Sequence, residues 1–153
     1  MHENFDLLEQ TIRLYNLKNV VAENFGLGDE EKVQQIKVYG SNSAVVLEKD
    51  ESSVYQEIKV KTLDNYASES KLNIGLIKVD IEGEEQQFLA GAKETIKEQK
   101  PTLLVSIYHN PEDFYEIKPM IEEWNLGYTF SVYKPCDYSI SCETLLIAEI
   151  LDK

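Results

Sequence analysis

The 153-residue sequence predicts a single α/β domain over residues 1–153, built as a three-layer sheet with helices on both faces. The first observation is alternation. Short apolar runs rich in β-branched residues are followed by segments whose apolar residues recur every three or four positions. The second is size, because a chain of this length with 42% hydrophobic residues can bury a sizeable core.

Composition and charge exclude several classes of protein. Fifteen basic residues against 28 acidic ones give a net charge of −13, which repels phosphate-rich partners. No apolar run approaches the roughly 18 residues needed to span a bilayer. The N-terminus lacks the basic and apolar stretches of a signal peptide. We therefore expect a cytoplasmic protein that binds neither nucleic acid nor membranes.

The first 61 residues predict one helix and three strands. Residues 3–17 indicate an amphipathic helix. Residues 20–24 predict a short strand that ends in a glycine-rich turn. Segments 33–39 and 54–61 alternate loosely between apolar and polar residues, which predicts an antiparallel pair. The apolar stripe of the helix is Phe5, Leu8, Ile12 and Tyr15.

A buried strand and a helix are predicted in the middle of the chain. Residues 76–81 are mostly apolar and β-branched, as in a central parallel strand covered on both faces. Glu84 and Glu85 then open a helix, where acidic residues complement the positive end of the helix dipole. Gly91 is expected to break this helix. Its buried face is Phe88, Leu89, Ala92 and Ile96.

The last third of the sequence predicts another strand, another helix and a terminal pair of strands. Residues 103–108 form the strand. Asn110 and Pro111 begin the helix as its N-cap and first helical residue. Segments 128–133 and 144–148 are typical of two antiparallel strands. The apolar stripe of the helix is Phe114, Ile117, Ile121 and Trp124.

Four residues that can carry chemistry follow the predicted strands, where ligands of open α/β sheets bind: Asn24, Asp80, Glu82 and His109. Asp80 and Glu82 are two residues apart, so their side chains leave on the same side. Two carboxylates and a histidine, a residue type that titrates near neutral pH, suit proton transfer from a substrate hydroxyl. We therefore expect Asp80, Glu82 and His109 to lie together and to be catalytic.

Other interpretations of these residues stay open. Glu82 can simply cap the following helix while Asp80 accepts backbone hydrogen bonds, and His109 can be structural. The two carboxylates can also bind a divalent metal, but without further ligands nearby this hypothesis is weaker, and we assign no metal. Cys136 and Cys142 lack the spacing of a zinc site and are expected to be reduced thiols.

Several motifs resemble one known family. The most specific is the nine-residue segment Ile77-Lys78-Val79-Asp80-Ile81-Glu82-Gly83-Glu84-Glu85. Shorter matches are Asn4-Phe5, Leu27-Gly28-Asp29, Thr62-Leu63-Asp64, Leu89-Ala90-Gly91-Ala92, Lys100-Pro101 and Glu143-Thr144-Leu145-Leu146. Together they resemble the FkbM-type family of S-adenosylmethionine-dependent methyltransferases, over nearly the whole chain.

The resemblance implies a Rossmann-like class I methyltransferase fold with S-adenosylmethionine as methyl donor. The family's domain is longer, so its first two strands, which hold much of the donor, would lie before Met1. By resemblance, Asn24 and Phe25 lie near the adenine and Asp80 near the methyl-transfer centre. Glu82 or His109 then lies near the acceptor oxygen.

The activity implied by the resemblance is O-methylation of a small-molecule or glycan hydroxyl. The alternative is a non-catalytic remnant or interaction module that does not bind the donor. The missing first strand would lie between residues 20–24 and 76–81, which leaves an open sheet edge. We expect that edge to be closed by strand rearrangement, by a homodimer or by a second chain, because unpaired backbone groups favour pairing.

Overall fold

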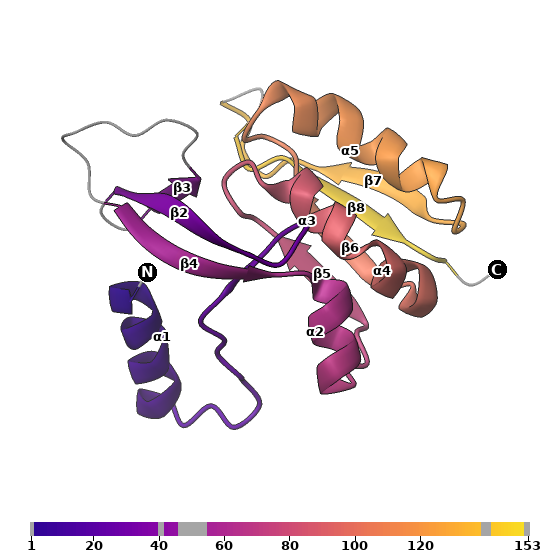
Figure 1. Cartoon of the computed structure of the whole chain (residues 1–153). Helices are drawn as coiled ribbons and strands as arrows, with labels where there is room; N and C mark the ends of the chain where they lie inside the picture. The colour runs from indigo at the N-terminus through magenta and orange to yellow at the C-terminus, as the bar shows by residue number, and fades with distance from the viewer. Residues whose placement is uncertain (1, 40–41, 46–54, 139–141, 152–153) are drawn as a thin grey trace. The chain divides into compact units, whose positions relative to one another are not determined.

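The computed structural model describes residues 2–39, 42–45, 55–138 and 142–151 (Figure 1). The chain divides into two compact units. The first comprises Met1–Gly26 and Glu31–Lys61, and the second comprises Leu27–Glu30 and Thr62–Lys153. No helix in the described ranges is long and apolar enough to cross a membrane.

One helix and a small four-stranded sheet make up most of the first unit. The elements are α1 (His2–Leu14), β1 (Gly26–Leu27), β2 (Lys32–Tyr39), β3 (Asn42–Val45) and β4 (Tyr55–Lys61). The sheet order is β1-β4-β2-β3, and β2 is antiparallel to both β3 and β4. The predicted antiparallel pair is therefore confirmed. Among the side chains of this sheet that the structure describes, Ile36 and Val60 are the buried apolar ones.

Two predictions in this unit need correction. The strand expected at residues 20–24 is wrong, because this segment is irregular and only Gly26–Leu27 pairs with the sheet. Val21 is 81% exposed, so the β-branched residues there have no sheet to pack on. Helix α1 ends three residues before the predicted Leu17, because Asn16 adopts a left-handed conformation with φ of 50°.

The second unit contains helices α2 to α5 and a four-stranded sheet. Its helices are α2 (Leu63–Ser70), α3 (Glu85–Gly91), α4 (Lys93–Gln99) and α5 (Pro111–Glu123). Its strands are β5 (Leu76–Val79), β6 (Thr102–Ser106), β7 (Thr129–Tyr133) and β8 (Leu145–Glu149), in the order β5-β6-β8-β7. Strands β5 and β6 are parallel, and the predicted antiparallel pair β7–β8 is confirmed.

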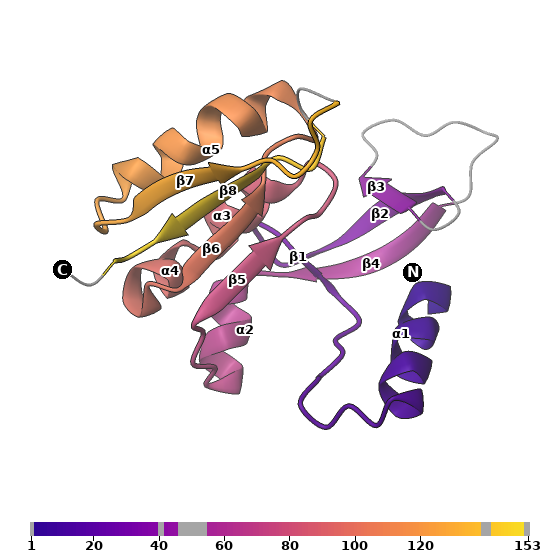
Figure 2. The ribbon, with the colours of Figure 1, turned by 180° about the vertical axis from the view of Figure 1, so that it is seen from behind.

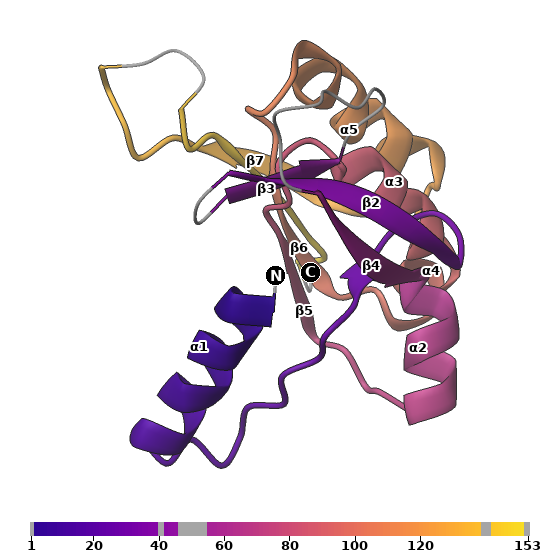
Figure 3. The same ribbon diagram turned by 60° about the vertical axis from the view of Figure 1, so that its left-hand side comes forward.

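Helices α2 to α5 cover one face of this sheet. Figure 2 shows the sheet from its opposite face, with the strands in front of the helices. The view in Figure 3 looks along the sheet and places these four helices on the same side of it. The sequence predicts helices on both faces, so the arrangement differs from the expected three layers. The alternation within β5 explains the difference: Ile77 and Val79 are buried, whereas Leu76 and Lys78 are exposed.

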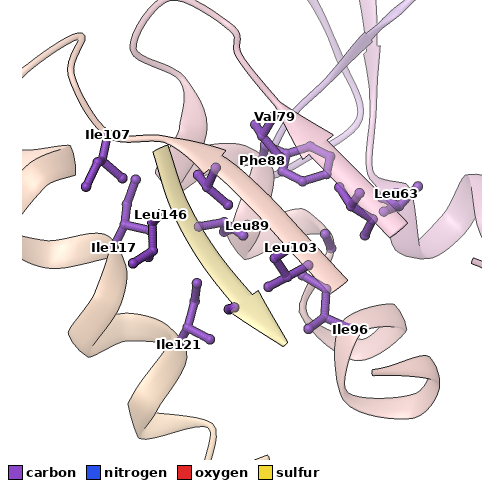
Figure 4. Close-up of a cluster of buried hydrophobic side chains, with 14 of the residues drawn as sticks. Leu63, Val79, Phe88, Leu89, Ile96, Leu103, Ile107, Ile117, Ile121 and Leu146 are labelled. Carbon is purple, nitrogen blue, oxygen red and sulfur yellow. The ribbon is translucent and has the colours of Figure 1, made fainter. Parts of the chain in front are cut away.

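The core of the second unit lies between this covered face and the helices (Figure 4). Strand residues meet helix residues there, and each fully buried side chain contributes about 1.5–3 kcal/mol to stability. The strands supply Ile77, Val79, Leu103, Val105, Leu146 and Ala148, and the helices supply Leu63, Phe88, Leu89, Ile96, Ile117 and Ile121. The predicted stripe of α3 and α4 is thereby confirmed as core, and so are Ile117 and Ile121 of α5, but Phe114 is 47% exposed. The predicted stripe of α1 is not buried, since Leu8 is 45% and Tyr15 69% exposed.

Strand β5 was expected to be central but is the edge strand of the sheet in the described part of the chain. Its pattern of β-branched residues predicts a strand but does not say how many neighbours it has. Leu76 is 57% exposed at this edge. The order β5-β6-β8-β7 thus leaves one side of β5 without a partner among the described strands.

Asp64 connects helices α2 and α4 of the second unit through hydrogen bonds. It lies in the first turn of α2, whose N-cap is Thr62. Its carboxylate accepts hydrogen bonds from the backbone N–H groups of Thr95 at 2.7 Å and Glu94 at 3.2 Å, in the first turn of α4. The Thr62-Leu63-Asp64 motif therefore caps the N-termini of two helices: Thr62 caps α2, and Asp64 accepts from the first turn of α4.

Gly91 breaks the predicted helix into α3 and α4, as expected. Glycine is required at this position because another backbone segment lies close to it. A Cβ atom on Gly91 would lie 1.9 Å from the carbonyl oxygen of Gly28, far inside any real contact. No side chain fits at this position unless the backbone of one segment moves.

We predict that Gly91→Ala destabilises the protein by about 2 kcal/mol, because the added methyl group displaces the Gly28 backbone. Urea unfolding measures the change. The control is Gly75→Ala, where an added Cβ meets nothing within 4 Å and the change should stay within about 0.5 kcal/mol. Equal effects of the two substitutions would contradict the close approach.

Candidate functional site

The candidate site lies where the parallel strands β5 and β6 end. Asp80 follows the last residue of β5, and His109 lies three residues beyond β6. Because the strands are parallel, these ends meet at one edge of the sheet. His109 Nε2 is 3.7 Å from Asp80 Oδ1 and 3.8 Å from Glu82 Oε2. The expected proximity of the three residues is confirmed, and their catalytic role stays a prediction.

Asp80 is held by three hydrogen-bond donors. Ser106 Oγ donates to Oδ1 at 2.9 Å, and the Tyr108 hydroxyl donates to the same atom at 3.3 Å. Lys78 Nζ donates to Oδ2 at 2.9 Å. Burial alone would raise the pKa of Asp80, but the bonds from Lys78 and Ser106 outweigh it and lower that pKa. Asp80 is therefore an anion with a fixed orientation.

His109 is oriented by a carboxylate that sequence reasoning did not assign to the site. Its Nδ1 atom lies 2.8 Å from Glu85 Oε1. The side chain of Glu85 is fully buried, whereas that of His109 is 11% exposed. The His109 ring also packs against the ring of Tyr108, with centroids 4.2 Å apart. One face of the imidazole is thus covered and one nitrogen is engaged.

Glu85 also holds the turn between β5 and α3. The backbone N–H of Ile81 donates to Glu85 Oε1 at 3.0 Å, and that of Gly83 donates to Oε2 at 2.9 Å. From the sequence, Glu85 looks like an ordinary acidic residue at a helix start. The signal that points further is the combination of a glutamate two residues after a glycine with a histidine just after the next strand.

The turn itself adopts unusual backbone angles. Glu82 has φ of 59° and Gly83 has φ of 103°, so two successive residues are left-handed. A glutamate in this conformation is strained, and such strain often accompanies functional sites. Glu84, not Glu82, is the N-cap of α3. The side chain of Glu82 is 54% exposed beside His109.

The surroundings of His109 are strongly negative. Burial raises the pKa of Tyr108 to about 12, and the nearby Asp80 carboxylate contributes in the same direction. The Tyr108 hydroxyl therefore stays protonated and remains a donor to Asp80. A neutral or cationic ligand suits this environment better than an anion.

A cavity of about 340 Å³ adjoins His109. Ring-bearing side chains dominate its lining, and its size falls within the range of small-molecule sites. Phe114 and Tyr115 pack edge to face there, with centroids 5.2 Å apart, although they are 47% and 72% exposed. The lining residues are Ile107, Tyr108, His109, Asn110, Pro111, Phe114 and Tyr115.

Asp80, Glu85 and His109 offer atoms within 4.8 Å of one another, which is compact enough for a metal ion. Their hydrogen bonds argue against that use. Coordination by Glu85 would break its bonds to two backbone N–H groups, and Asp80 already accepts from three donors, including an ammonium. The cluster is better described as a hydrogen-bonded network than as a vacant metal site.

Asn24 and Phe25, the residues expected near the adenine, belong to the first unit. Asn24 is exposed, and Phe25 is half-buried just before β1. Lys61 Nζ lies over the Phe25 ring, 5.1 Å from its centroid. Their role toward a cofactor stays a prediction. Cys136 and Cys142 form no disulfide bond within the described part of the chain.

Comparison with known proteins identifies the family. A sequence model of the FkbM methyltransferase domain matches residues 7–130. The chain belongs to the FkbM methyltransferase family. A crystal structure of methyltransferase FkbM from Methylobacillus flagellatus KT shares the fold, with a TM-score of 0.69 at 23% sequence identity. No match is found among curated protein sequences.

The FkbM relative is much longer than this chain. The likeness covers 97% of the chain but 34% of the relative. Asp80, Glu82 and His109 all lie within the residues matched by the FkbM domain model. The comparison therefore shows the family and the fold of this chain. It does not show that the chain has the activity, substrates or partners of a complete FkbM protein.

Asp113, beside this FkbM site, is a buried acid with an incomplete set of partners. It is 1% exposed, and its Oδ1 accepts from Gln86 Nε2 at 3.2 Å. Its Oδ2 has no hydrogen-bond partner among the described residues. Burial raises the pKa of Asp113, and the negative charge of Glu85 adds to this.

We predict that Asp113→Asn alters the pH dependence of stability. An acid whose pKa is raised by folding contributes stability at low pH and loses it as pH rises through the folded-state pKa. The variant should therefore gain stability relative to the wild type between pH 3.5, below the ordinary aspartate pKa of 3.8, and pH 7. Urea unfolding at both pH values measures this, with the exposed Glu116→Gln as control. A stability difference independent of pH would contradict the prediction.

Proposed function

We propose that this chain forms part of an S-adenosylmethionine-dependent methyltransferase that acts on a hydroxyl of a small molecule or glycan. One observation carries the proposal. Within a domain of the FkbM family, His109 faces two carboxylates at the carboxyl ends of parallel strands. A base beside fixed negative charge is what removal of a hydroxyl proton next to a cationic donor requires.

The residues present fit such a donor in charge. When bound, S-adenosylmethionine supplies an activated methyl group on a positively charged sulfonium. Asp80 and Glu82 are carboxylates that can stabilise a positive charge nearby. Asp80 is restrained by Ser106 and Lys78, so it can orient a group without moving. Asn24 and Phe25 are proposed to contact the adenine.

In this proposal His109 is the general base. Its Nε2 accepts the proton of the acceptor hydroxyl while Glu82, exposed on the same side, accepts a hydrogen bond from the acceptor. Asp80 and Glu82 then stabilise the imidazolium that results. Methyl transfer needs little covalent participation by the protein, so orientation and proton removal are the main contributions.

The cavity beside His109 is proposed to receive the acceptor. Its ring-bearing wall suits a cyclic molecule, because aromatic faces pack well on sugar and planar rings. The carboxylates nearby disfavour an acceptor with a negative charge close to the reacting hydroxyl. A neutral glycan or cyclic alcohol meets both conditions.

The open edge of β5 is proposed to pair with another strand, from a second copy or a separate chain. This edge has no partner among the described strands, and it carries the exposed Leu76. Sedimentation velocity should then show a species heavier than the monomer, and Leu76→Lys should reduce it. A monodisperse monomer at high concentration would refute pairing with a second copy and leave pairing with a separate chain.

We predict that S-adenosylmethionine perturbs the NMR amide resonances of residues 80–83 and of Asn24 and Phe25. Affinity should be weak, in the millimolar range of about −4 kcal/mol, because the chain spans 34% of its relative. Methyl β-D-glucopyranoside should shift resonances of Tyr108 and Phe114. Absence of any response to the donor at millimolar concentration would favour the non-catalytic alternative.

We further predict that Asp80→Asn weakens the donor response about tenfold, the loss of about 1.4 kcal/mol. The unfolding free energy should fall by less than about 1 kcal/mol, because an asparagine still accepts from Ser106. Asp64→Asn is the matched control: it should cost about 1 kcal/mol of stability through α4 and leave the donor response unchanged. Equal loss of stability and donor response in Asp80→Asn would indicate a structural role.

A further inference from the structure

We propose that Glu85 is a positioning residue that fixes His109 in the tautomer protonated at Nδ1, which leaves the Nε2 lone pair facing Asp80 and Glu82. The proton-accepting role of Nε2 rests on the proposed function. The tautomer itself does not, because it follows from the hydrogen bonds of the free protein.

The hydrogen bonds that Glu85 accepts place the proton of the contact with His109 on Nδ1. Two backbone N–H groups, of Ile81 and Gly83, donate to the two oxygens of Glu85. In these bonds both carboxylate oxygens act as acceptors. His109 Nδ1 lies 2.8 Å from Oε1, and a contact of that length requires a proton between the two atoms. The proton must therefore sit on Nδ1.

The same contact excludes the other tautomer. With the proton on Nε2, the Nδ1 lone pair would face Glu85 Oε1 at 2.8 Å, and two acceptors at that distance repel each other. The ring cannot easily turn away. His109 is 11% exposed, and its ring packs on Tyr108 with centroids 4.2 Å apart. Position and tautomer are thus set together.

His109 Nε2 makes no hydrogen bond to the two carboxylates that it faces. Its separations of 3.7 Å from Asp80 Oδ1 and 3.8 Å from Glu82 Oε2 are too long for hydrogen bonds. The lone pair therefore remains available to a substrate proton. Once that proton is accepted, the imidazolium lies among three carboxylates, those of Asp80, Glu82 and Glu85, which stabilise its charge.

In the proposed step a proton moves from the acceptor to His109 and a methyl group moves to the acceptor. The O–H bond of the acceptor breaks and an N–H bond forms at Nε2. The acceptor oxygen forms a bond to the methyl carbon, and the S–CH₃ bond breaks with its electron pair left on sulfur. Glu85 keeps its hydrogen bond to Nδ1 throughout and is not itself protonated.

Glu85 also links the base to the turn that carries Glu82. The same carboxylate that binds Nδ1 holds the N–H groups on either side of Glu82. The left-handed angles of Glu82 and Gly83 are stabilised by these bonds. One buried residue therefore sets the positions of both His109 and Glu82.

NMR of the histidine ring nitrogens tests the proposal without any substrate. The chain has two histidines, His2 and His109, so ¹⁵N-histidine labelling gives two ring spin systems, and His2→Gln assigns them. We expect neutral His109 to show a protonated Nδ1 and an unprotonated Nε2. A wild-type His109 protonated at Nε2 would overturn the proposal.

Glu85→Gln extends the test. The amide has one acceptor oxygen for three N–H donors, so the ratio of Nδ1–H to Nε2–H tautomer should fall at least about tenfold. Glu98→Gln removes an exposed acid of α4 and should leave the ratio unchanged. An unchanged ratio in folded Glu85→Gln would overturn the proposal. If Glu85→Gln does not fold, the wild-type spectrum alone decides.

The outcomes separate this inference from the proposed function. Nδ1 protonation together with a donor response supports both. Nδ1 protonation without any response to S-adenosylmethionine supports the positioning role and refutes the proposed binding of the donor by this chain. Nε2 protonation refutes the positioning role whether or not the donor binds.

Discussion

The buried carboxylate of Glu85 is the interaction on which the geometry of the site depends. It accepts from the backbone of Ile81 and Gly83 and lies 2.8 Å from His109. A charged group without solvent contact is tolerated only when donors surround it, and here three do. Because those donors come from the turn after β5 and the loop after β6, satisfying one carboxylate brings the two strand ends together.

The sequence predicts the elements that depend on a local residue pattern. It does not predict which strands lie next to each other in the sheet. The sequence alone locates β5, β6, the break at Gly91 and the Asn110 cap, because alternation, helical spacing and capping chemistry are local. It does not say that β5 is an edge strand, since the same β-branched run serves one or two partners. The wrong prediction of a strand at residues 20–24 has the same cause, because a β-branched run does not show whether a partner strand is present.

The site was predictable in its residues more than in its organisation. Asp80, Glu82 and His109 follow from the rule that ligands bind beyond the ends of parallel strands. Glu85 could not be distinguished from any acid at a helix start, because its importance lies in contacts with residues before it and 24 positions after it. Strand alternation also failed to describe Glu82, whose backbone is left-handed.

Amide hydrogen exchange of Ile81 and Gly83 in the ligand-free protein is the most direct test of this account. Both N–H groups donate to a fully buried carboxylate, so the turn should be organised before any ligand binds. We predict that both amides exchange at least about a hundredfold more slowly than an unprotected peptide. Exchange of either amide at the unprotected rate would contradict the central role of Glu85.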